Sequence, residues 1–315
     1  MKILSMDELR NLDIPEPLAL VGDNLFLWNG KFVIYGPSGT YNSFLTQQLM
    51  FCISEGQDWF GHKVHQTVPS AYVELESTPK GKQQRLENLG LAYGVRGTQF
   101  YQTLEYDFSL TRDFKVLIKE MQERGIKAVA LDPLNLMMEG SEISGQVMAD
   151  ITRAANIIRA ETQALVGVVH HMNKGSYHEG KRVDKGIDEA SGHKNLMNWT
   201  DTAIRVERVD LPYTAKVRVD KVREGDLPPE QWVRFDRDMK ILVPSDNDPR
   251  TLIIAKLKAG PATGGEIDKM LKDQAGMGKN AASAMRTRME GEDMLRGYAD
   301  PTNTKRKLWI LGERI

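Results

Sequence analysis

An eight-residue segment near the N-terminus carries residue types suited to holding phosphate. Residues 31–35 (KFVIY) form a short apolar run, and residues 36–43 (GPSGTYNS) follow it directly. From Phe44 to Cys52 the apolar residues recur at helical spacing. A glycine turn between a buried strand and a helix aims backbone N–H groups at a ligand, and the helix N-terminus favours an anion. The segment therefore predicts a phosphate-binding loop, and an ordinary strand-to-helix turn is the alternative.

The loop departs from the usual phosphate-binding pattern at two positions. In G-x-x-x-x-G-K-[ST] the lysine reaches the β- and γ-phosphates and the final hydroxyl binds Mg²⁺. Gly36 and Ser43 match this pattern, whereas Tyr41 replaces the second glycine and Asn42 replaces the lysine. Loss of the lysine removes a charge-assisted contact to phosphate. Natural loss of catalysis, a deliberate inactivating substitution and rescue by another cation are all open explanations. The candidates for that cation are Lys80 and Lys82.

Polar residues follow the next three strand-like runs of the chain. Asp132 suits a carboxylate that orders the magnesium shell, and Glu76 suits a residue that orients the attacking water. His170 and His171 end the third run, where a side chain can sense the γ-phosphate. Each residue alone has an ordinary explanation as a helix cap or a hydrogen-bonded core residue. Their succession after the glycine loop predicts a single nucleotide site.

Strands and helices alternate through the first half of the chain, which predicts a parallel sheet with helices on both faces. The predicted strands are 31–35, 71–75, 128–131 and 165–169, and the predicted helices are 44–52, a stretch holding Arg85 and Leu89, 114–124 and 146–162. After Asp184 the apolar residues alternate with period two, which predicts antiparallel strands with one wet face. These strands are 202–208, 215–221 and 232–236.

A polar break at residues 244–249 predicts a boundary between a core at 1–245, with a lead-in at 1–28, and a domain at 250–315. Three short helices and two strands in this tail predict a winged helix. These are residues 252–257, 265–271 and 280–289, then strands near 298 and at 307–311. The tail has 13 Lys and Arg against 8 Asp and Glu, which is typical of a domain with a polyanionic partner, and an ordinary solvated surface is the alternative explanation. The candidate DNA contacts are Lys279, Arg286, Arg288, Lys305 and Arg306, and a protein-binding role is the alternative.

Composition excludes several classes of protein. The chain has 315 residues, 41% of them hydrophobic and 27% charged, which suffices for a full core and argues against disorder. Its one cysteine, Cys52, excludes a disulfide framework and a cysteine-built metal centre. The N-terminus lacks a signal-peptide core, and no stretch approaches 18 uninterrupted apolar residues. We therefore expect a soluble, cytosolic protein with no membrane partner.

These motifs together resemble the RecA-fold ATPases, in particular the plasmid RepA-type and phage-encoded hexameric helicase-like branch. The resemblance runs from about residue 20 to residue 235. It is carried by residues 35–44 (YGPSGTYNSF), 59–61 (WFG), Glu76 with Gly81 and Arg85, 131–134 (LDPL), 169–174 (VHHMNK), 191–193 (SGH) and 201–208 (DTAIRVER). It implies that Glu76 is the catalytic carboxylate, Asp132 the Walker B acid and His171 the sensor.

The resemblance also implies ATP and Mg²⁺ as cofactors, with the metal at Ser43 and Asp132. The nucleotide would contact Gly36, Pro37, Ser38, Gly39, Thr40, Tyr41, Asn42, Ser43 and Phe44. A hexameric ring is implied, in which Arg205 or Arg208 reaches the neighbouring subunit. Lys216, Lys221 and Arg223 are alternatives for that role. Single-stranded DNA would meet a polar, basic loop at residues 173–185, with Lys174, Lys181 and Arg182 as candidate contacts.

The expected protein is thus an α/β, RecA-like ATPase core with a C-terminal winged helix. Its expected function is that of an oligomeric DNA motor or remodeller in phage or plasmid replication or recombination. Its expected location is the cytoplasm of a bacterium or phage-infected host, with replication or recombination proteins as further partners. A catalytically impaired ATP-binding DNA scaffold and a strand-annealing recombination mediator are the alternatives.

Overall fold

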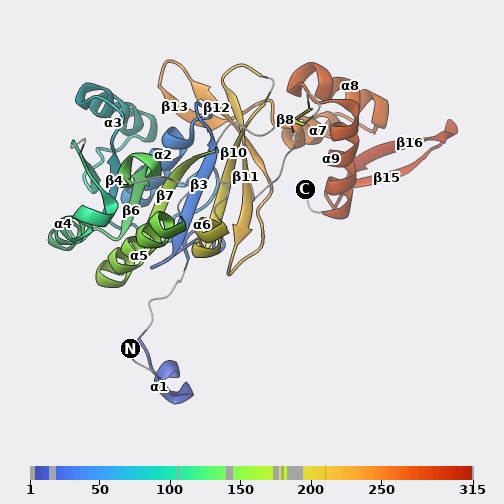
Figure 1. Cartoon of the computed structure of the whole chain (residues 1–315). Helices are drawn as coiled ribbons and strands as arrows, with labels where there is room; N and C mark the ends of the chain where they lie inside the picture. The colour runs from blue at the N-terminus through green and yellow to red at the C-terminus, as the bar shows by residue number, and fades with distance from the viewer. Residues whose placement is uncertain are drawn as a thin grey trace. The chain divides into compact units, whose positions relative to one another are not determined.

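A nine-stranded sheet with helices on both faces dominates the computed structural model (Figure 1). The structure describes residues 4–13, 19–104, 107–139, 145–172, 177–178, 181–182, 194–209 and 211–313. The strand order in the sheet is β13-β12-β11-β10-β3-β7-β6-β4-β5. The strands are β3 (Lys31–Pro37), β4 (Ser70–Glu74), β5 (Phe100–Gln102), β6 (Ala128–Asp132), β7 (Leu165–Met172), β10 (Thr202–Arg208), β11 (Thr214–Val222), β12 (Gln231–Asp236) and β13 (Ile241–Pro244).

The strands from β10 to β5 pair in parallel, which confirms the parallel sheet predicted for the first half of the chain. The carboxyl ends of β3, β7, β6 and β4 therefore lie next to one another at one edge. The strand predicted at 202–208 is β10, and it pairs with β3. This pairing is parallel, so the prediction of an antiparallel strand is wrong here. The first five residues of β10 are buried, as in a strand covered on both faces. The prediction is confirmed for β11 and β12, which pair antiparallel.

Two sets of helices cover the central strands (Figure 1). Val33 and Tyr35 of β3 face a core built with α4, α5 and α6, whereas α2 packs on the opposite face. Successive residues of a strand point to opposite faces, so one short apolar run serves both layers. The helices are α2 (Asn42–Glu55), α3 (Pro79–Tyr93), α4 (Leu110–Glu123), α5 (Gly145–Thr162) and α6 (Lys194–Trp199).

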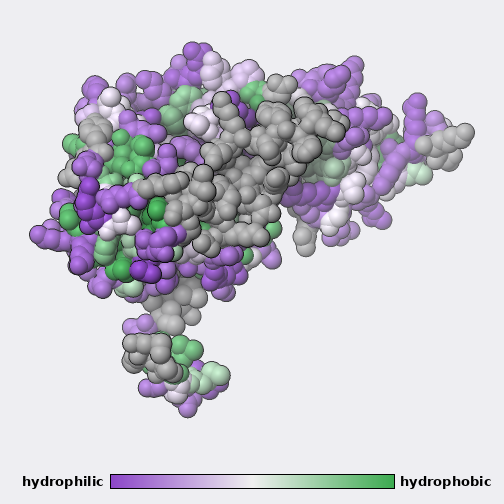
Figure 2. Space-filling view, in the orientation of Figure 1, coloured by the Kyte–Doolittle hydropathy of each residue, from purple (hydrophilic) through white to green (hydrophobic). Residues whose placement is uncertain are grey.

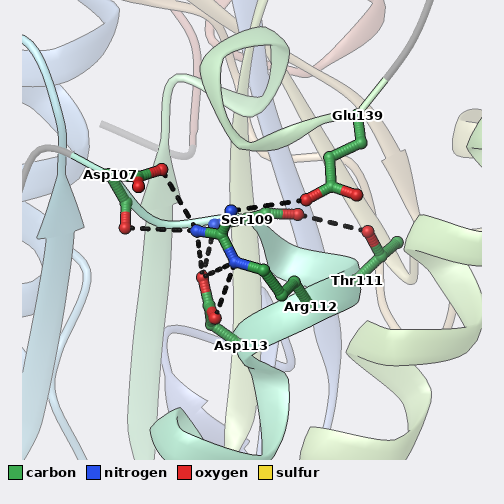
Figure 3. Close-up of polar contacts among 6 residues, drawn as sticks. All are labelled: Asp107, Ser109, Thr111, Arg112, Asp113 and Glu139. Carbon is green, nitrogen blue, oxygen red and sulfur yellow. Dashed lines mark hydrogen bonds and ion pairs between the residues drawn. The ribbon is translucent and has the colours of Figure 1, made fainter.

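The start of α4 is held by an exposed cluster of charges (Figure 3). Arg112 Nη2 lies 3.1 Å from Asp107 Oδ1 and 2.8 Å from Asp113 Oδ2, and its Nη1 lies 3.6 Å from Glu139 Oε1. These hydrogen bonds raise the pKa of Arg112 and lower that of Asp113. Exposed ion pairs add little stability, so these contacts contribute little to the free energy of unfolding.

The chain divides into two compact units, residues 1–206, 218–229 and 237–241, and residues 207–217, 230–236 and 242–315. Within the second unit, the elements occur in the order helix, strand, helix, helix, strand, strand. They are α7 (Pro249–Lys258), β14 (Ala262–Thr263), α8 (Gly264–Ala275), α9 (Lys279–Gly291), β15 (Leu295–Asp300) and β16 (Asn303–Leu311). The three strands form a sheet in the order β14-β16-β15. Apolar residues of all three helices pack with Leu295 and Trp309 in a separate core.

Hydrophilic residues cover most of the coloured surface in Figure 2, with smaller hydrophobic areas on the side where α4 lies. Val116 of α4 and Leu104 after β5 are 63% and 61% exposed. No helix in the described ranges has the length and apolar character needed to cross a bilayer.

Gly167 of β7 gives a direct test of packing in the sheet. It pairs in register with Phe32, and a Cβ at this position would lie 1.9 Å from Cζ of the buried Phe32 ring. We expect Gly167→Ala to lower the free energy of unfolding by about 1–3 kcal/mol, as for overpacked cores, measured by urea denaturation. Gly265→Ala, where a Cβ meets nothing within 4 Å, should cost no stability. Equal stability of the two variants would contradict the packing described here.

Candidate functional site

The segment from β3 to α2 has the backbone conformation of a tight, concave loop. Gly39 and Tyr41 adopt positive φ angles of 75° and 69°. Tyr41 therefore takes a left-handed conformation that glycine adopts without strain and that other residues seldom adopt. At Gly36 a Cβ would lie 2.3 Å from the Val206 carbonyl oxygen, so no larger residue fits. The loop keeps its shape although tyrosine replaces the second glycine of the motif.

The side chain of Asn42 turns back onto this loop. It is 2% exposed, and its Nδ2 donates to the carbonyl oxygens of Gly36 at 3.2 Å and Pro37 at 3.4 Å. The Thr40 hydroxyl donates to the Pro37 carbonyl at 2.6 Å and to Asn42 Oδ1 at 3.3 Å. Asn42 thus stabilises the loop by neutral hydrogen bonds and brings no positive charge to it.

Asp132 lies at the carboxyl end of β6 and is fully buried. The Tyr72 hydroxyl donates to Asp132 Oδ2 and lies 3.1 Å from the Ser43 carbonyl oxygen. Tyr72 of β4 therefore connects β6 to the first turn of α2. Sequence analysis did not identify this residue, since a tyrosine inside an apolar strand gives no signal that its hydroxyl reaches a carboxylate.

Burial dominates the electrostatics of this site. It raises the pKa of Asp132 to about 6, while hydrogen bonds from Tyr72 and Ser43 and the nearby His171 oppose the rise. Burial also raises the pKa of Tyr72, and the Asp132 carboxylate raises it further. A cation beside Asp132 would relieve the cost of its charge.

Ser43 and Asp132 fit the demands of Mg²⁺. Asp132 Oδ1 is buried and accepts no hydrogen bond from any described residue, and the Ser43 hydroxyl is close enough to lower the pKa of Asp132. Among the described residues, no group of three or more His, Cys, Asp or Glu side chains could hold a metal ion. Mg²⁺ commonly binds through one or two protein oxygens and completes its shell with water and phosphate.

His171 lies beside the loop, because it pairs in register with Gly36 across β3 and β7. Its Nδ1 is buried and has no hydrogen-bond partner among the described residues. His170 is fully buried. The position of His171 is compatible with the predicted sensor role.

Glu76 and Glu74 lie in very different environments at the end of β4. Glu76 is exposed, whereas Glu74 is 2% exposed and pairs in register with Asp132. Glu74 Oε1 accepts hydrogen bonds from the N–H groups of Glu76 at 2.8 Å and Ser77 at 2.6 Å. The buried Glu74 thus orients the turn that carries Glu76, a role that sequence analysis missed.

Neither lysine proposed as a substitute cation suits that role. Lys82 is buried, lies 3.5 Å from Glu74 Oε2, and donates to the carbonyl oxygens of Glu74 and Thr103. These contacts lie at β4 and beyond β5, and β4 is separated from β3 by β7 and β6. Lys80 is exposed and donates to Gln83.

The two arginines considered for the subunit contact also differ. The prediction of a wet face at Arg205 is wrong, because its side chain is 2% exposed and its Nε lies 3.1 Å from Asp220 Oδ2. The Tyr35 hydroxyl donates to the same carboxylate at 2.5 Å. Arg208 is exposed. The alternatives are engaged within the chain: Lys216 with Glu207, Lys221 with two carbonyl groups, and Arg223 with Asp201.

The basic residues proposed to meet DNA fall into three groups. Lys279 and Arg306 are exposed. Arg286 is buried in an ion pair with Asp268, and Arg288 pairs with Glu230 and Glu292. Lys174 and the side chains of Lys181, Arg182 and Lys305 lie outside the described part of the structure.

The raised pKa of Asp132 predicts a pH dependence of stability. Between about pH 4 and 6 the folded protein keeps this proton while the unfolded chain releases it, so the free energy of unfolding falls as pH rises. The fall is at most about 3 kcal/mol and levels off above the folded pKa. Asp132→Asn should remove this part of the pH dependence in urea denaturation of metal- and nucleotide-free protein. Parallel stability curves for the two proteins would contradict the assignment.

Comparisons with known proteins identify a matching family and several solved structures with a similar fold. The AAA domain family matches residues 2–177. An ATPase domain of known structure is 12% identical, with a TM-score of 0.54 over 71% of this chain and 86% of that one. A DnaB-like replicative helicase is 12% identical, with a TM-score of 0.50 over 69% of this chain and 57% of that one. The RadB recombinase is 15% identical, with a TM-score of 0.47 over 70% and 93%. No match was found among curated proteins. The chain has the fold of RecA-like P-loop ATPases and belongs to the AAA domain family.

Proposed function

We propose that the protein binds ATP with Mg²⁺ and acts as an oligomeric, helicase-like motor or remodeller on DNA, in phage or plasmid replication or recombination. The observation that carries the proposal is the loop at residues 36–43. Its backbone turns tightly between β3 and α2, with positive φ at Gly39 and Tyr41, and it lies beside a buried carboxylate that lacks a partner for Oδ1 among the described residues. The AAA family match and the folds of the solved ATPase domain and replicative helicase agree with this assignment.

The loop and the N-terminus of α2 can offer backbone N–H donors to phosphate whatever side chain stands at position 42. Asn42 adds only neutral hydrogen bonds, and it uses them within the loop. Electrostatic stabilisation of the transferring phosphoryl group is the main catalytic device in this chemistry. The absence of a positive charge at position 42 should therefore slow ATP hydrolysis more than it weakens ATP binding. We expect weak ATP binding with slow or absent hydrolysis.

Each remaining residue has a role that its position supports. Ser43 and Asp132 would hold Mg²⁺, which neutralises charge on the β- and γ-phosphates when bound. Glu76, on a turn fixed by Glu74, would orient the attacking water. His171, next to Gly36, would contact the γ-phosphate.

Assembly and DNA binding rest on other surfaces. Arg208 is the more accessible of the two arginine-finger candidates, because its side chain is exposed whereas that of Arg205 is buried. Val116 and Leu104 expose apolar surface of the kind that subunit contacts cover. The order of elements in residues 249–311 supports a winged helix, with Lys279 and Arg306 as its most accessible candidate contacts to phosphate.

Two other functions are compatible with the same loop. A catalytically impaired ATP-binding scaffold on DNA is favoured by Asn42, and a strand-annealing recombination mediator needs no unwinding activity. ATP turnover with and without single-stranded DNA separates a motor from both, and annealing without unwinding identifies the mediator.

Restoring the missing charge tests the proposal directly. Asn42→Lys should raise ATP turnover by about a hundredfold or more, the scale expected for one positioned electrostatic group. The measurement is phosphate release with and without single-stranded DNA. The double variant Asn42→Lys, Glu76→Gln should bind ATP as well as Asn42→Lys alone, but it should lose the turnover gained by Asn42→Lys. Turnover in the original chain that Asn42→Lys leaves unchanged would contradict the proposed defect.

The DNA role predicts a difference among the basic residues of the second unit. Lys279→Gln and Arg306→Gln should each weaken single-stranded DNA binding and reduce the slope of log affinity against log salt by about one. Arg288→Gln is the matched control, because Arg288 already pairs with Glu230 and Glu292. Unchanged slopes in all three variants, measured by fluorescence anisotropy, would favour a protein-binding role for this unit.

A further inference from the structure

Arg85 of α3 lies against the first turn of the helix that follows the phosphate loop. Its guanidinium carbon is 4.3 Å from the centroid of the Phe44 ring, and Phe44 follows Ser43 directly. The Tyr41 and Phe44 ring centroids are 6.3 Å apart in an edge-on contact. An aromatic face attracts a guanidinium and fixes its plane, so Phe44 holds this cation beside the loop.

The contact leaves the hydrogen-bonding groups of Arg85 available. A guanidinium carries five N–H donors, and stacking on a ring uses none of them. Within the described ranges, no side chain or carbonyl group accepts a hydrogen bond from Arg85 or forms an ion pair with it. The other two cations of α3 are committed elsewhere, since Lys82 is buried with Glu74 and Lys80 binds Gln83.

Phe44 also places Arg85 next to the residues proposed to hold the metal. Phe44 follows Ser43 in the first turn of α2. The Tyr72 hydroxyl contacts both Asp132 and the Ser43 carbonyl oxygen. The contact between Phe44 and Arg85 therefore lies at the same end of α2 as the proposed magnesium ligands.

We propose that Arg85, held by Phe44, binds the terminal phosphates of the nucleotide and so retains part of the ground-state affinity that a lysine at position 42 would give, without restoring turnover. The inference rests on the proposed ATP site and names a residue that contributes to ATP binding there in the absence of a lysine. A planar, permanently charged fork suits bidentate binding of phosphate oxygens. The contact should therefore favour triphosphate over monophosphate.

The experiment measures binding of ATP and AMP to the full chain with Mg²⁺, by isothermal titration calorimetry. We expect Arg85→Gln to weaken ATP binding by about tenfold or more, the scale of a lost charged hydrogen bond, and AMP binding far less. Arg96→Gln is the matched control, because Arg96 is an exposed arginine just beyond the same helix. Phe44→Leu keeps the charge but removes the ring that holds it, and should cause a smaller loss. Circular dichroism verifies that each variant is folded.

A double-variant comparison distinguishes a specific role of Arg85 at the phosphates from a general effect of removing a positive charge. In the Asn42→Lys background, Arg85→Gln should cost less ATP affinity than in the original chain, because two cations then share one function. Equal ATP affinity of Arg85→Gln, Arg96→Gln and the original chain would overturn the inference and leave the ATP site intact. If neither the original chain nor Asn42→Lys binds ATP, the proposed function falls and the inference with it.

Discussion

The hydroxyl of Tyr72 connects the parts of the molecule on which the site depends. It donates to the buried carboxylate of Asp132 and contacts the carbonyl of Ser43, and so links two strands to the helix after the phosphate loop. A buried carboxylate is costly unless its oxygens have partners, and Tyr72 supplies only one of them. The remaining oxygen, Asp132 Oδ1, is left without a described donor. The fold thus stabilises an acid that a cation would complete.

The phosphate loop shows that shape and charge are separate requirements. Its shape depends on glycines at positions 36 and 39 and on the left-handed conformation of Tyr41, all of which the chain retains. A lysine at position 42 would add charge without being needed for the backbone geometry. Asn42 is buried, and its amide donates hydrogen bonds to the loop's own carbonyl groups. A chain can therefore lose the usual cation while its loop remains folded, and a cation on a neighbouring helix can then retain part of the affinity for phosphate.

Much of the sheet and part of the site could be predicted from the sequence. The apolar runs before Gly36, Glu76, Asp132 and His171 identified four strands, because buried parallel strands are continuous in hydrophobicity. The side chains buried among them were not predictable. Tyr72 and Glu74 lie within an apolar strand and Lys82 lies in the helix that follows it, and nothing in their spacing shows that their polar atoms meet. The burial of Arg205 was missed for the same reason, since its partner Asp220 lies on a different strand of the sheet.

Amide hydrogen exchange of the unmodified chain, with and without Mg²⁺ and ATP, tests the central claim most directly. The claim is that backbone N–H groups at the start of α2 bind phosphate although position 42 has no lysine. The account predicts slower exchange on addition of ATP in peptides covering residues 38–44, and little change with AMP. Unchanged exchange in those peptides at ATP concentrations that saturate binding would contradict it.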